Sequence, residues 1–381
     1  MYIKTGRFLA FCFFLVFTGT QPIFPLDIDG RAPSFSRTGE FAGIVNILNG
    51  LLQYHFNSAL NQARGVVDGI NPKPERFIRA WSNSAAFASH GATQQAYGEY
   101  NLLSLTAGAM IGLQIPSSPF TFADEFDNIP DTMNRDGDLQ IGFNLQAFVV
   151  QLGINTSRFL LNNLYLGFRF GYVNIRENSA LIPIDGFSYN TTTLGILANY
   201  QLFSEINLGR GLFQWRRLNL GTGFVYNRTG VRYRIALAPF SANFYVPGLS
   251  NVGLRVDPGL DFDMNINTFT IPLEAVTSVR LSRFFNFALG LGADLVFGRS
   301  DIRIGMEGDI NVTGIDNFPI RQEHPGYLSI ATGGAVAPNF FNPKLMFGLG
   351  FTTGPFILDI PVTWYFGNHG FNVGITAGFS W

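Results

Sequence analysis

Apolar and polar residues alternate without a break along the last eleven residues of the chain. The apolar positions are Phe371, Val373, Ile375, Ala377, Phe379 and Trp381. This alternation predicts a β-strand with one apolar and one polar face, because successive side chains of a strand point to opposite sides. Eleven residues is about the length that a tilted strand needs to cross a bilayer. We therefore expect the chain to end on a membrane-crossing strand.

The same alternation recurs throughout residues 99–381, which predicts an all-β transmembrane fold: an antiparallel up-and-down β-barrel. After Phe297 the apolar positions change from odd to even numbers, starting at Ile302. A change of phase needs a turn or a bulge, and residues 298–300 (Gly-Arg-Ser) have turn chemistry, so we expect two strands there. The expected strands are then about twelve, at 100–115, 139–155, 164–175, 191–203, 218–227, 269–281, 285–297, 302–312, 327–335, 345–351, 356–364 and 371–381.

The strand number rests on two further observations. An up-and-down barrel whose two chain ends both lie in the periplasm needs an even number of strands, and short turns then lie inside and long loops outside. Fourteen strands are the alternative if residues 236–265 contain a hairpin. Pro239, Pro247 and Pro258 favour a loop there, because proline cannot donate to a strand ladder.

Composition agrees with a membrane barrel. Hydrophobic residues make up 47% of the chain and charged residues only 13%, about half of what is usual for soluble domains. The net charge of -1 and the absence of a basic block argue against a nucleic-acid partner. Beyond the leader, we find no apolar run of about 18 residues that would predict a helical span.

The terminal amphipathic strand and its last residue, Trp381, resemble the closing strand of bacterial outer-membrane β-barrels. The resemblance implies a location in outer-membrane lipid and recognition of the last strand by the barrel-assembly machinery. A large soluble β-sandwich or lipocalin-like barrel is the alternative, but it would need more charge on its surface.

The first 98 residues do not follow the strand pattern. Residues 1–26 have the form of a signal peptide, with Lys4 and Arg7 before an apolar stretch that holds the chain's single cysteine, Cys12. Residues 27–98 are expected to form an N-terminal helical segment, since apolar residues recur at three- and four-residue steps from about Glu40 to Val67. This segment either plugs the lumen or lies in the periplasm.

Charged and amide side chains fall on the face of the strands that we assign to the lumen. These residues would set the field of a pore, or fill the lumen as ion pairs that hold the barrel in shape. Glycines on the same face, Gly112 and Gly142 among them, either allow strand curvature or make room for the N-terminal segment. The lumen-lining candidates are Arg169, Arg217, Glu274, Arg280, Asp294, Asp359, Asn144 and Gln146.

A barrel with an N-terminal plug resembles, in architecture alone, the FadL-type importers of hydrophobic compounds. That resemblance implies passive uptake of small or hydrophobic solutes, gated by the N-terminal helix. The alternative function is that of a surface-exposed adhesin or ligand-binding protein that uses the barrel as an anchor, with the aromatic residues of 236–265 as the contact surface.

Catalysis and cofactors find little support in the sequence. The histidines, His55, His90, His324 and His369, are scattered and lie in no nucleophile motif, so we expect no enzyme and no cofactor. One acidic loop has calcium-type ligands without the spacing of an EF-hand, and a solvated loop is the simpler interpretation. The weak calcium candidates are Asp131, Asn134, Asp136 and Asp138.

Overall fold

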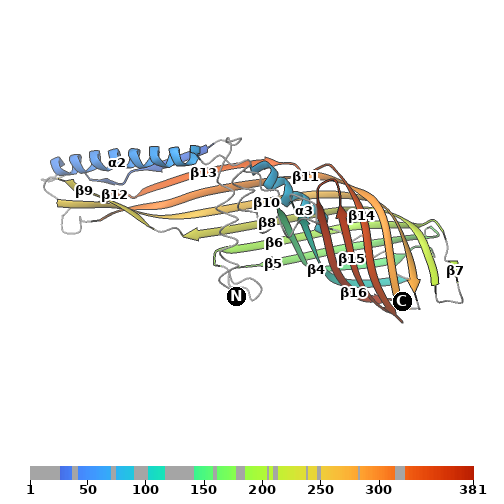
Figure 1. Cartoon of the computed structure of the whole chain (residues 1–381). Coiled ribbons are helices and arrows are strands. Elements are labelled where there is room, and N and C mark those ends of the chain that lie inside the picture. Colours follow the sequence, from blue (N-terminus) through green and yellow to red (C-terminus); the bar gives the residue numbers. More distant parts are fainter. Residues whose placement is uncertain are drawn as a thin grey trace.

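A computed structural model describes residues 26–36, 42–69, 74–89, 102–115, 141–157, 161–176, 185–203, 206–208, 213–236, 239–246, 250–281, 284–313 and 322–381. Ten antiparallel strands close into a ring, in which the last strand pairs with the first (Figure 1). The ring strands, in order, are β3 (Leu103–Gln114), β4 (Gly142–Asn155), β5 (Leu164–Ile175), β6 (Phe187–Gln201), β8 (Phe213–Ala236), β10 (Ser250–Leu281), β11 (Phe285–Thr313), β14 (Phe341–Thr353), β15 (Phe356–Tyr365) and β16 (Gly370–Ser380).

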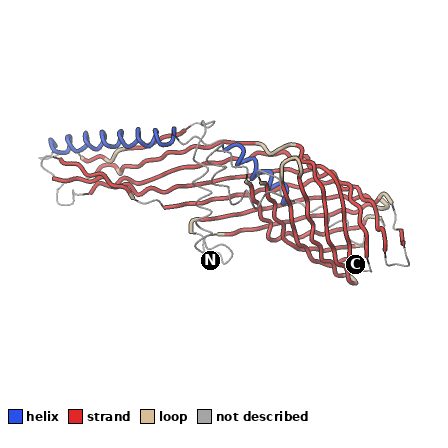
Figure 2. The backbone as a smooth tube through the Cα atoms, in the orientation of Figure 1, coloured by secondary structure: helices blue, strands red, loops and turns tan. Residues whose placement is uncertain are grey.

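Three ring strands continue far beyond the ring and form a second part of the molecule, which we call the lobe (Figure 2). Strand β10 has 32 residues and β11 has 29, whereas 9 to 11 residues suffice to cross a bilayer. Shorter strands prolong the sheet, so that β9 continues the line of β8 along β10 and β13 continues the line of β14 along β11. The additional strands are β1 (Leu26–Arg31), β2 (Ser34–Phe35), β9 (Phe240–Val246), β12 (Gln322–His324) and β13 (Gly326–Val336) in the lobe, and β7 (Ile206–Leu208), which pairs with β8 at the ring's other end.

Helix α2 (Ala42–Gly69) covers one face of the lobe sheet (Figure 1). Its apolar side chains, among them Val45, Leu48 and Phe56, pack on apolar residues of β10, β11 and β13. The lobe therefore has a hydrophobic core of its own. Burial of each of these large apolar side chains contributes roughly 1.5–3 kcal/mol to its stability. Helix α3 (Pro74–Ala88) instead packs against ring strands.

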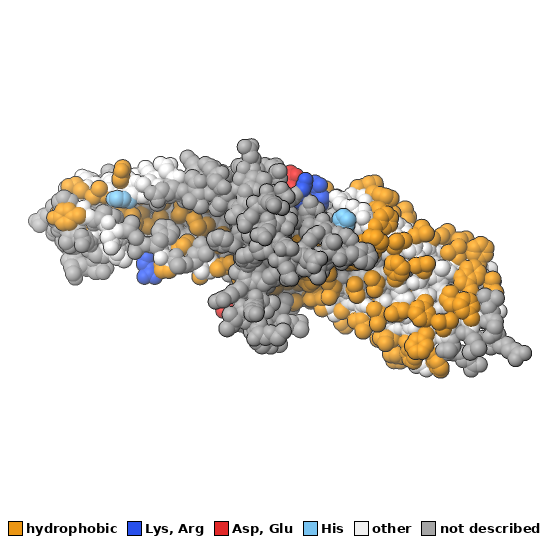
Figure 3. Space-filling model, viewed as in Figure 1, with side chains coloured by type: hydrophobic (Ala, Val, Ile, Leu, Met, Phe, Trp, Pro, Cys, Tyr) orange, Lys and Arg blue, Asp and Glu red, His pale blue; other side chains and the backbone are white. Residues whose placement is uncertain are grey.

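The outer surface of the ring is apolar. Large hydrophobic side chains gather there over β14 to β16 and β3, whereas the face of the lobe seen in the same view is mixed (Figure 3). No helix among the described residues is long and apolar enough to span a bilayer. The fold class is as predicted, an all-β antiparallel transmembrane barrel with an N-terminal helical segment. Exposed apolar residues of the ring include Leu105, Ile111, Phe168, Phe170, Leu194, Ile196, Phe224, Phe269, Leu289, Leu291, Phe347, Leu349 and Ile375.

The strand number around the ring differs from the expected twelve. The two strands expected on either side of residues 298–300 are one continuous strand, β11, and 327–335 belongs to β13 in the lobe. Residues 236–265 hold the hairpin of β9 and β10, but this hairpin lengthens existing strands and adds none to the ring. Pro258 is tolerated because it lies at the gap where β9 has ended and β8 has not yet paired.

The physical reason for the apparent phase change at residue 298 is a change of solvent. Along β11 the odd-numbered residues point outward from end to end. Phe297 and the outward residues before it are apolar, whereas Arg299, Asp301 and Arg303 are polar. The inward residues change in the opposite sense, since Ile302 and Ile304 are buried in an apolar core. The strand therefore keeps its register while the surroundings of its two faces exchange.

The first and last described residues do not lie on the same side of the ring. Trp381 lies at the ring's free rim, where the backbone N–H of Leu103 donates to its carbonyl oxygen at 2.9 Å. Strand β1, at the start of the described chain, pairs with β13 in the lobe. The parity argument holds for the ring alone, because its first and last strands, β3 and β16, meet at the same rim.

Candidate functional site: the closed lumen

Helix α3 crosses the lobe-side mouth of the ring. Residues Ser82 to Ala88 of the helix, and Ser89 directly after it, are all buried, and the helix touches β3, β4, β8, β10, β11, β13 and β16. Two ring glycines permit this close approach. A Cβ on Gly142 would lie 2.0 Å from the carbonyl oxygen of Ala80, and one on Gly112 would lie 2.2 Å from that of Ser84. At these positions the glycines make room for the helix.

Other inward glycines have a different neighbour. A Cβ on Gly108 would lie 2.2 Å from the carbonyl oxygen of Ile375, and one on Gly378 would lie 2.1 Å from that of Leu105, both on adjacent strands. These glycines allow neighbouring strands to curve tightly. The two explanations that the sequence left open therefore apply to different positions.

Aromatic and polar contacts hold α3 in the mouth. The ring of Phe87 stacks on Tyr365 of β15, with centroids 3.8 Å apart and planes 15° apart. The Asn83 amide donates to Gln114 Oε1 at 2.8 Å, and Asn372 Nδ2 donates to the Phe87 carbonyl oxygen at 2.6 Å. These contacts tie the helix to three strands, β3, β15 and β16.

Below α3, a buried cation lies between two acids. Lys344 Nζ on β14 donates to Asp294 Oδ1 of β11 at 2.6 Å and to Glu274 Oε1 of β10. The side chains of Lys344 and Asp294 are 0% exposed, and that of Glu274 is 7% exposed. Removing one member of such a buried group leaves an uncompensated charge, which costs about 3–5 kcal/mol. The predicted residues Asp294 and Glu274, together with Lys344, thus form ion pairs that link three consecutive ring strands, β10, β11 and β14.

Hydroxyl and amide groups fill the next part of the lumen. Asn144 Nδ2 donates to Thr229 Oγ1 at 2.9 Å, and the Thr229 hydroxyl donates to Asn227 Oδ1 at 2.9 Å. Asn227 Nδ2 donates to Thr193 Oγ1 at 3.1 Å, whose hydroxyl donates to Gln146 Oε1 at 2.7 Å. The predicted residues Asn144 and Gln146 therefore lie at two ends of one network that spans β4, β6 and β8.

Other predicted lumen residues lie apart from both groups. Arg169 is buried and donates from Nη2 to Met110 Sδ at 2.9 Å, and Asp359 is buried on β15. Arg280 is half-buried and donates from Nε to Asn286 Oδ1 at 3.3 Å. Arg217 stands opposite Ser278 in the β8–β10 ladder. Of the predicted lumen residues, the structure thus links Glu274 with Asp294, through Lys344, and Asn144 with Gln146, through a chain of hydrogen bonds.

Two buried cations were missed by the sequence reasoning. Lys344 comes one residue before the strand expected to start at Leu345, although its even number places it on the inward face with Met346. Arg216 is 2% exposed at a bulge of β8, where the register shifts. Alternation would have identified Lys344 if the strand had been extended by one residue, but a bulge breaks the alternation and hides Arg216.

The acidic calcium candidates, Asp131, Asn134, Asp136 and Asp138, lie outside the described residues. So do residues 1–25 of the expected signal peptide and His90. Within the described ranges, no group of three or more His, Cys, Asp or Glu side chains is arranged to hold a metal.

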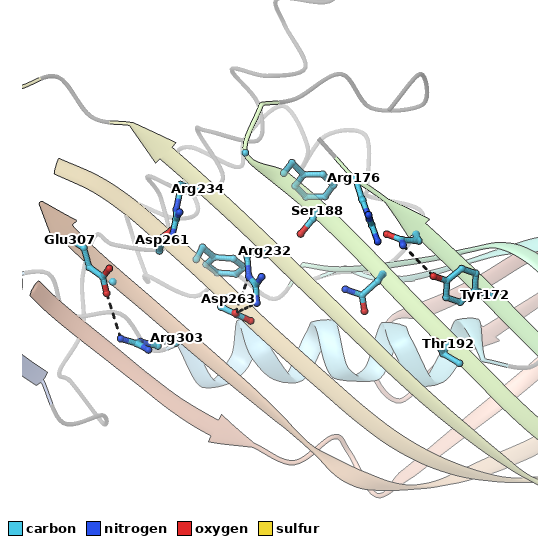
Figure 4. A pocket seen from close by; sticks show the side chains of 16 residues that line it. Tyr172, Arg176, Ser188, Thr192, Arg232, Arg234, Asp261, Asp263, Arg303 and Glu307 are labelled. Carbon is cyan, nitrogen blue, oxygen red and sulfur yellow. Dashed lines mark hydrogen bonds and ion pairs between the residues drawn. The ribbon is translucent and has the colours of Figure 1, made fainter. Parts of the chain in front are cut away.

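A polar groove of about 860 Å³ lies on the outer face of the sheet where the ring meets the lobe. It crosses β5, β6, β8, β10 and β11, with a helix behind the sheet (Figure 4). Arg232 donates to Asp263 Oδ2 at 3.0 Å, and Arg303 lies 3.8 Å from Glu307 Oε1. These side chains are largely exposed, in contrast to the ion pairs of the lumen.

Residues 45–381 match the model of one protein family, described as Lsa36-like. The chain belongs to the Lsa36-like family. No curated protein matches the chain. The matched span includes α2 apart from its first turn, together with α3 and every ring strand, so the family is defined by the ring and most of the lobe together.

Among the solved structures with detectable likeness are three bacterial proteins. The translocator domain of autotransporter NalP from Neisseria meningitidis is 8% identical, with 76% of this chain and 92% of that chain covered and a TM-score of 0.28. The toluene transporter TodX of P. putida is 9% identical over 78% and 94%, with a TM-score of 0.25. The transport unit of autotransporter AIDA-I from Escherichia coli is 10% identical over 81% and 99%, with a TM-score of 0.23.

Proposed function

We propose that the protein is a bacterial outer-membrane anchor whose closed barrel displays the lobe as a binding surface outside the cell. The observation that carries this proposal is the length of β10. At about 3.4 Å per residue, its 32 residues extend roughly 105 Å, several times the thickness of the hydrocarbon core. A strand needed only to cross the bilayer would be a third as long. The excess builds the lobe sheet and supports α2.

The closed lumen also supports an anchor. Helix α3 lies across one mouth, and beneath it the ion pairs of Lys344 and the hydrogen-bond network from Asn144 to Gln146 are buried. An open aqueous pore would expose such side chains to water. In the described part of the lumen these groups instead link ring strands to one another, across the lumen and between neighbours, and hold the ring in shape.

The distribution of turns supports an outside location for the lobe. The tight turn between β14 and β15 and the last residue, Trp381, lie at the rim opposite the lobe. Outer-membrane barrels have short turns on the periplasmic side and long connections on the outside. In this orientation the exposed side chain of Trp381 ends the apolar surface at the periplasmic interface, where the assembly machinery would read the last strand.

Site-specific labelling of intact cells tests the orientation. The single cysteine of the sequence, Cys12, lies in the expected signal peptide, so in a chain without that segment Tyr245→Cys in the lobe and Thr353→Cys at the opposite rim each introduce a unique thiol. Both positions are exposed. A membrane-impermeant maleimide should label the Tyr245→Cys variant on intact cells and the Thr353→Cys variant only after permeabilisation. The reverse pattern would place the lobe in the periplasm and overturn the proposal.

Gated uptake of small or hydrophobic solutes is the second candidate. The position of α3 favours this function. The helix lies across the mouth of the ring but is not part of the strand ladders of the sheet, so it could leave the mouth while the ring stays closed. Conductance in planar bilayers separates the two functions. The full chain should be silent if it is an anchor, whereas spontaneous openings would favour uptake.

A further inference from the structure

On the lobe side, the apolar outer surface of the ring ends at a row of five side chains, one on each of five neighbouring strands, at positions that are paired from strand to strand. Phe170 of β5, Leu194 of β6, Tyr226 of β8, Phe269 of β10 and Phe297 of β11 are paired in sequence across the sheet. Aromatic residues of this kind favour the interface between hydrocarbon and headgroups. This row therefore marks where the sheet leaves the hydrocarbon.

The next outward row lies two residues farther along each strand. It consists of Tyr172, Thr192, Arg228, Asn267 and Arg299, again paired across the five strands. Two residues correspond to roughly 7 Å along a strand. The headgroup layer on each side of a bilayer is about 5–8 Å thick. On β8 and on β11 the guanidinium groups of Arg228 and Arg299 thus lie just beyond the last apolar side chain of the same strand, within reach of lipid phosphates.

Positive charge predominates over the first rows beyond the apolar surface. Three more outward arginines follow within four residues, at 176, 232 and 303, and among the described residues of these rows only Asp263 and Asp301 oppose the five arginines. Farther into the lobe the balance reverses, where Arg234 and Arg255 face four acids. Those acids are Asp257, Asp261, Glu307 and Asp309.

Existing ion pairs leave this face able to bind an anion. Arg228 has no ion pair or side-chain hydrogen bond with another described residue. Arg299 donates to Asp301 Oδ1 at 2.8 Å, yet its side chain remains 73% exposed. A guanidinium group carries five N–H donors in a planar fork, which suits bidentate contact with phosphate oxygens.

We propose that this arginine-rich outer face docks the phosphorylated headgroups of outer-leaflet lipids. The groove of about 860 Å³ begins at Tyr172 and extends past Arg232 and Arg303, so it runs from the interface into the lobe (Figure 4). A headgroup would rest on the sheet with its phosphate near Arg228 and Arg299 and its acyl chains along the apolar ring. The contact would fix the height of the barrel in the membrane.

Lipid retention by the full mature chain tests this proposal. The protein, folded in detergent, is offered diphosphoryl lipid A or the same lipid with its phosphates removed, and bound lipid is counted by native mass spectrometry. The test variant is Arg228→Gln/Arg299→Gln, and the matched control is Arg255→Gln, an exposed arginine of the lobe that pairs with Asp257. At about 1 kcal/mol for each arginine near an anionic surface, the double variant should retain about 30-fold less diphosphoryl lipid.

Three results decide the matter. Preference of the unmodified protein for the phosphorylated lipid, lost in the double variant and kept in the control, supports the proposal. Equal retention of both lipids by the unmodified protein would mean that the apolar ring alone binds them, and this comparison needs no variant to fold. Displacement of the lipid by inorganic phosphate at equal concentration would identify a site for free anions instead. Either of the last two results overturns the proposal, and neither bears on the labelling test of the lobe.

Discussion

Truncation of Phe87 tests whether α3 closes the ring. The side chain is 0% exposed, stacks on Tyr365 and lies against Gly370, where an added Cβ would meet the Phe87 ring at 2.2 Å. Replacement of a buried phenylalanine by alanine costs about 3–5 kcal/mol, and each 1.4 kcal/mol changes an equilibrium tenfold. If this contact holds α3 in the mouth, Phe87→Ala should raise the undocked fraction by roughly two to three and a half orders of magnitude.

The assay is single-channel recording of the full mature chain in planar bilayers. Phe87→Ala should produce brief openings at a frequency far above that of the unmodified protein. The matched control is Leu48→Ala in α2, because Leu48 is also 0% exposed but packs in the lobe. This control should lose comparable stability, roughly 2–5 kcal/mol, without openings. Silence of folded Phe87→Ala would refute α3 as the closure and would assign closure to the side chains beneath it.

Three further predictions concern the ring and the lobe. Lys344→Met should lower the melting temperature measured by heat-dependent mobility on gels, because Asp294 and Glu274 would remain buried without their cation, at a cost of about 3–5 kcal/mol. A normal melting temperature would contradict the buried ion pairs. Gly142→Leu should displace α3, because its Cβ would overlap the helix backbone, and should make α3 accessible to protease in the folded barrel. Gly43→Ala in α2 meets no atom within 4 Å and should be neutral or stabilise the protein by roughly 0.5–1 kcal/mol in the same melting assay. Destabilisation by Gly43→Ala would contradict the open surroundings of that residue.

The sequence by itself determined the class of fold and which residues of a regular ring strand share a face. Period-two alternation over eleven residues is decided by local geometry, since a strand has no other way to place its side chains. It assigns Asp294, Glu274 and Asn144 to the inward face, because charged and amide groups cannot face lipid without a large cost, and in the structure Asn144 and Asp294 are buried and the Glu274 side chain is 7% exposed. The helical character of residues 42–69 was likewise visible in the spacing of apolar residues.

Partners within the lumen could not be read from the alternation. The side chains that meet come from strands far apart in sequence, as Lys344 and Glu274 do. Which inward residue meets which depends on the stagger of strands around the ring, and that is set only when the sheet closes. The bulge that buries Arg216 is equally invisible to a pattern that assumes strict alternation.

The lobe is the part of the molecule that only the tertiary structure decided. Alternation reports that two faces differ, but it does not state which face meets lipid, water or another element. Along β11 the apolar face is outward up to Phe297 and inward from Ile302, because the same strand passes from the bilayer to a sheet that α2 and α3 cover. In the sequence, this exchange of faces looks like a change of phase, which predicts two separate strands. The continuous strand exists because the hydrophobic effect acts on whichever face is removed from water, and that face changes where the strand leaves the membrane.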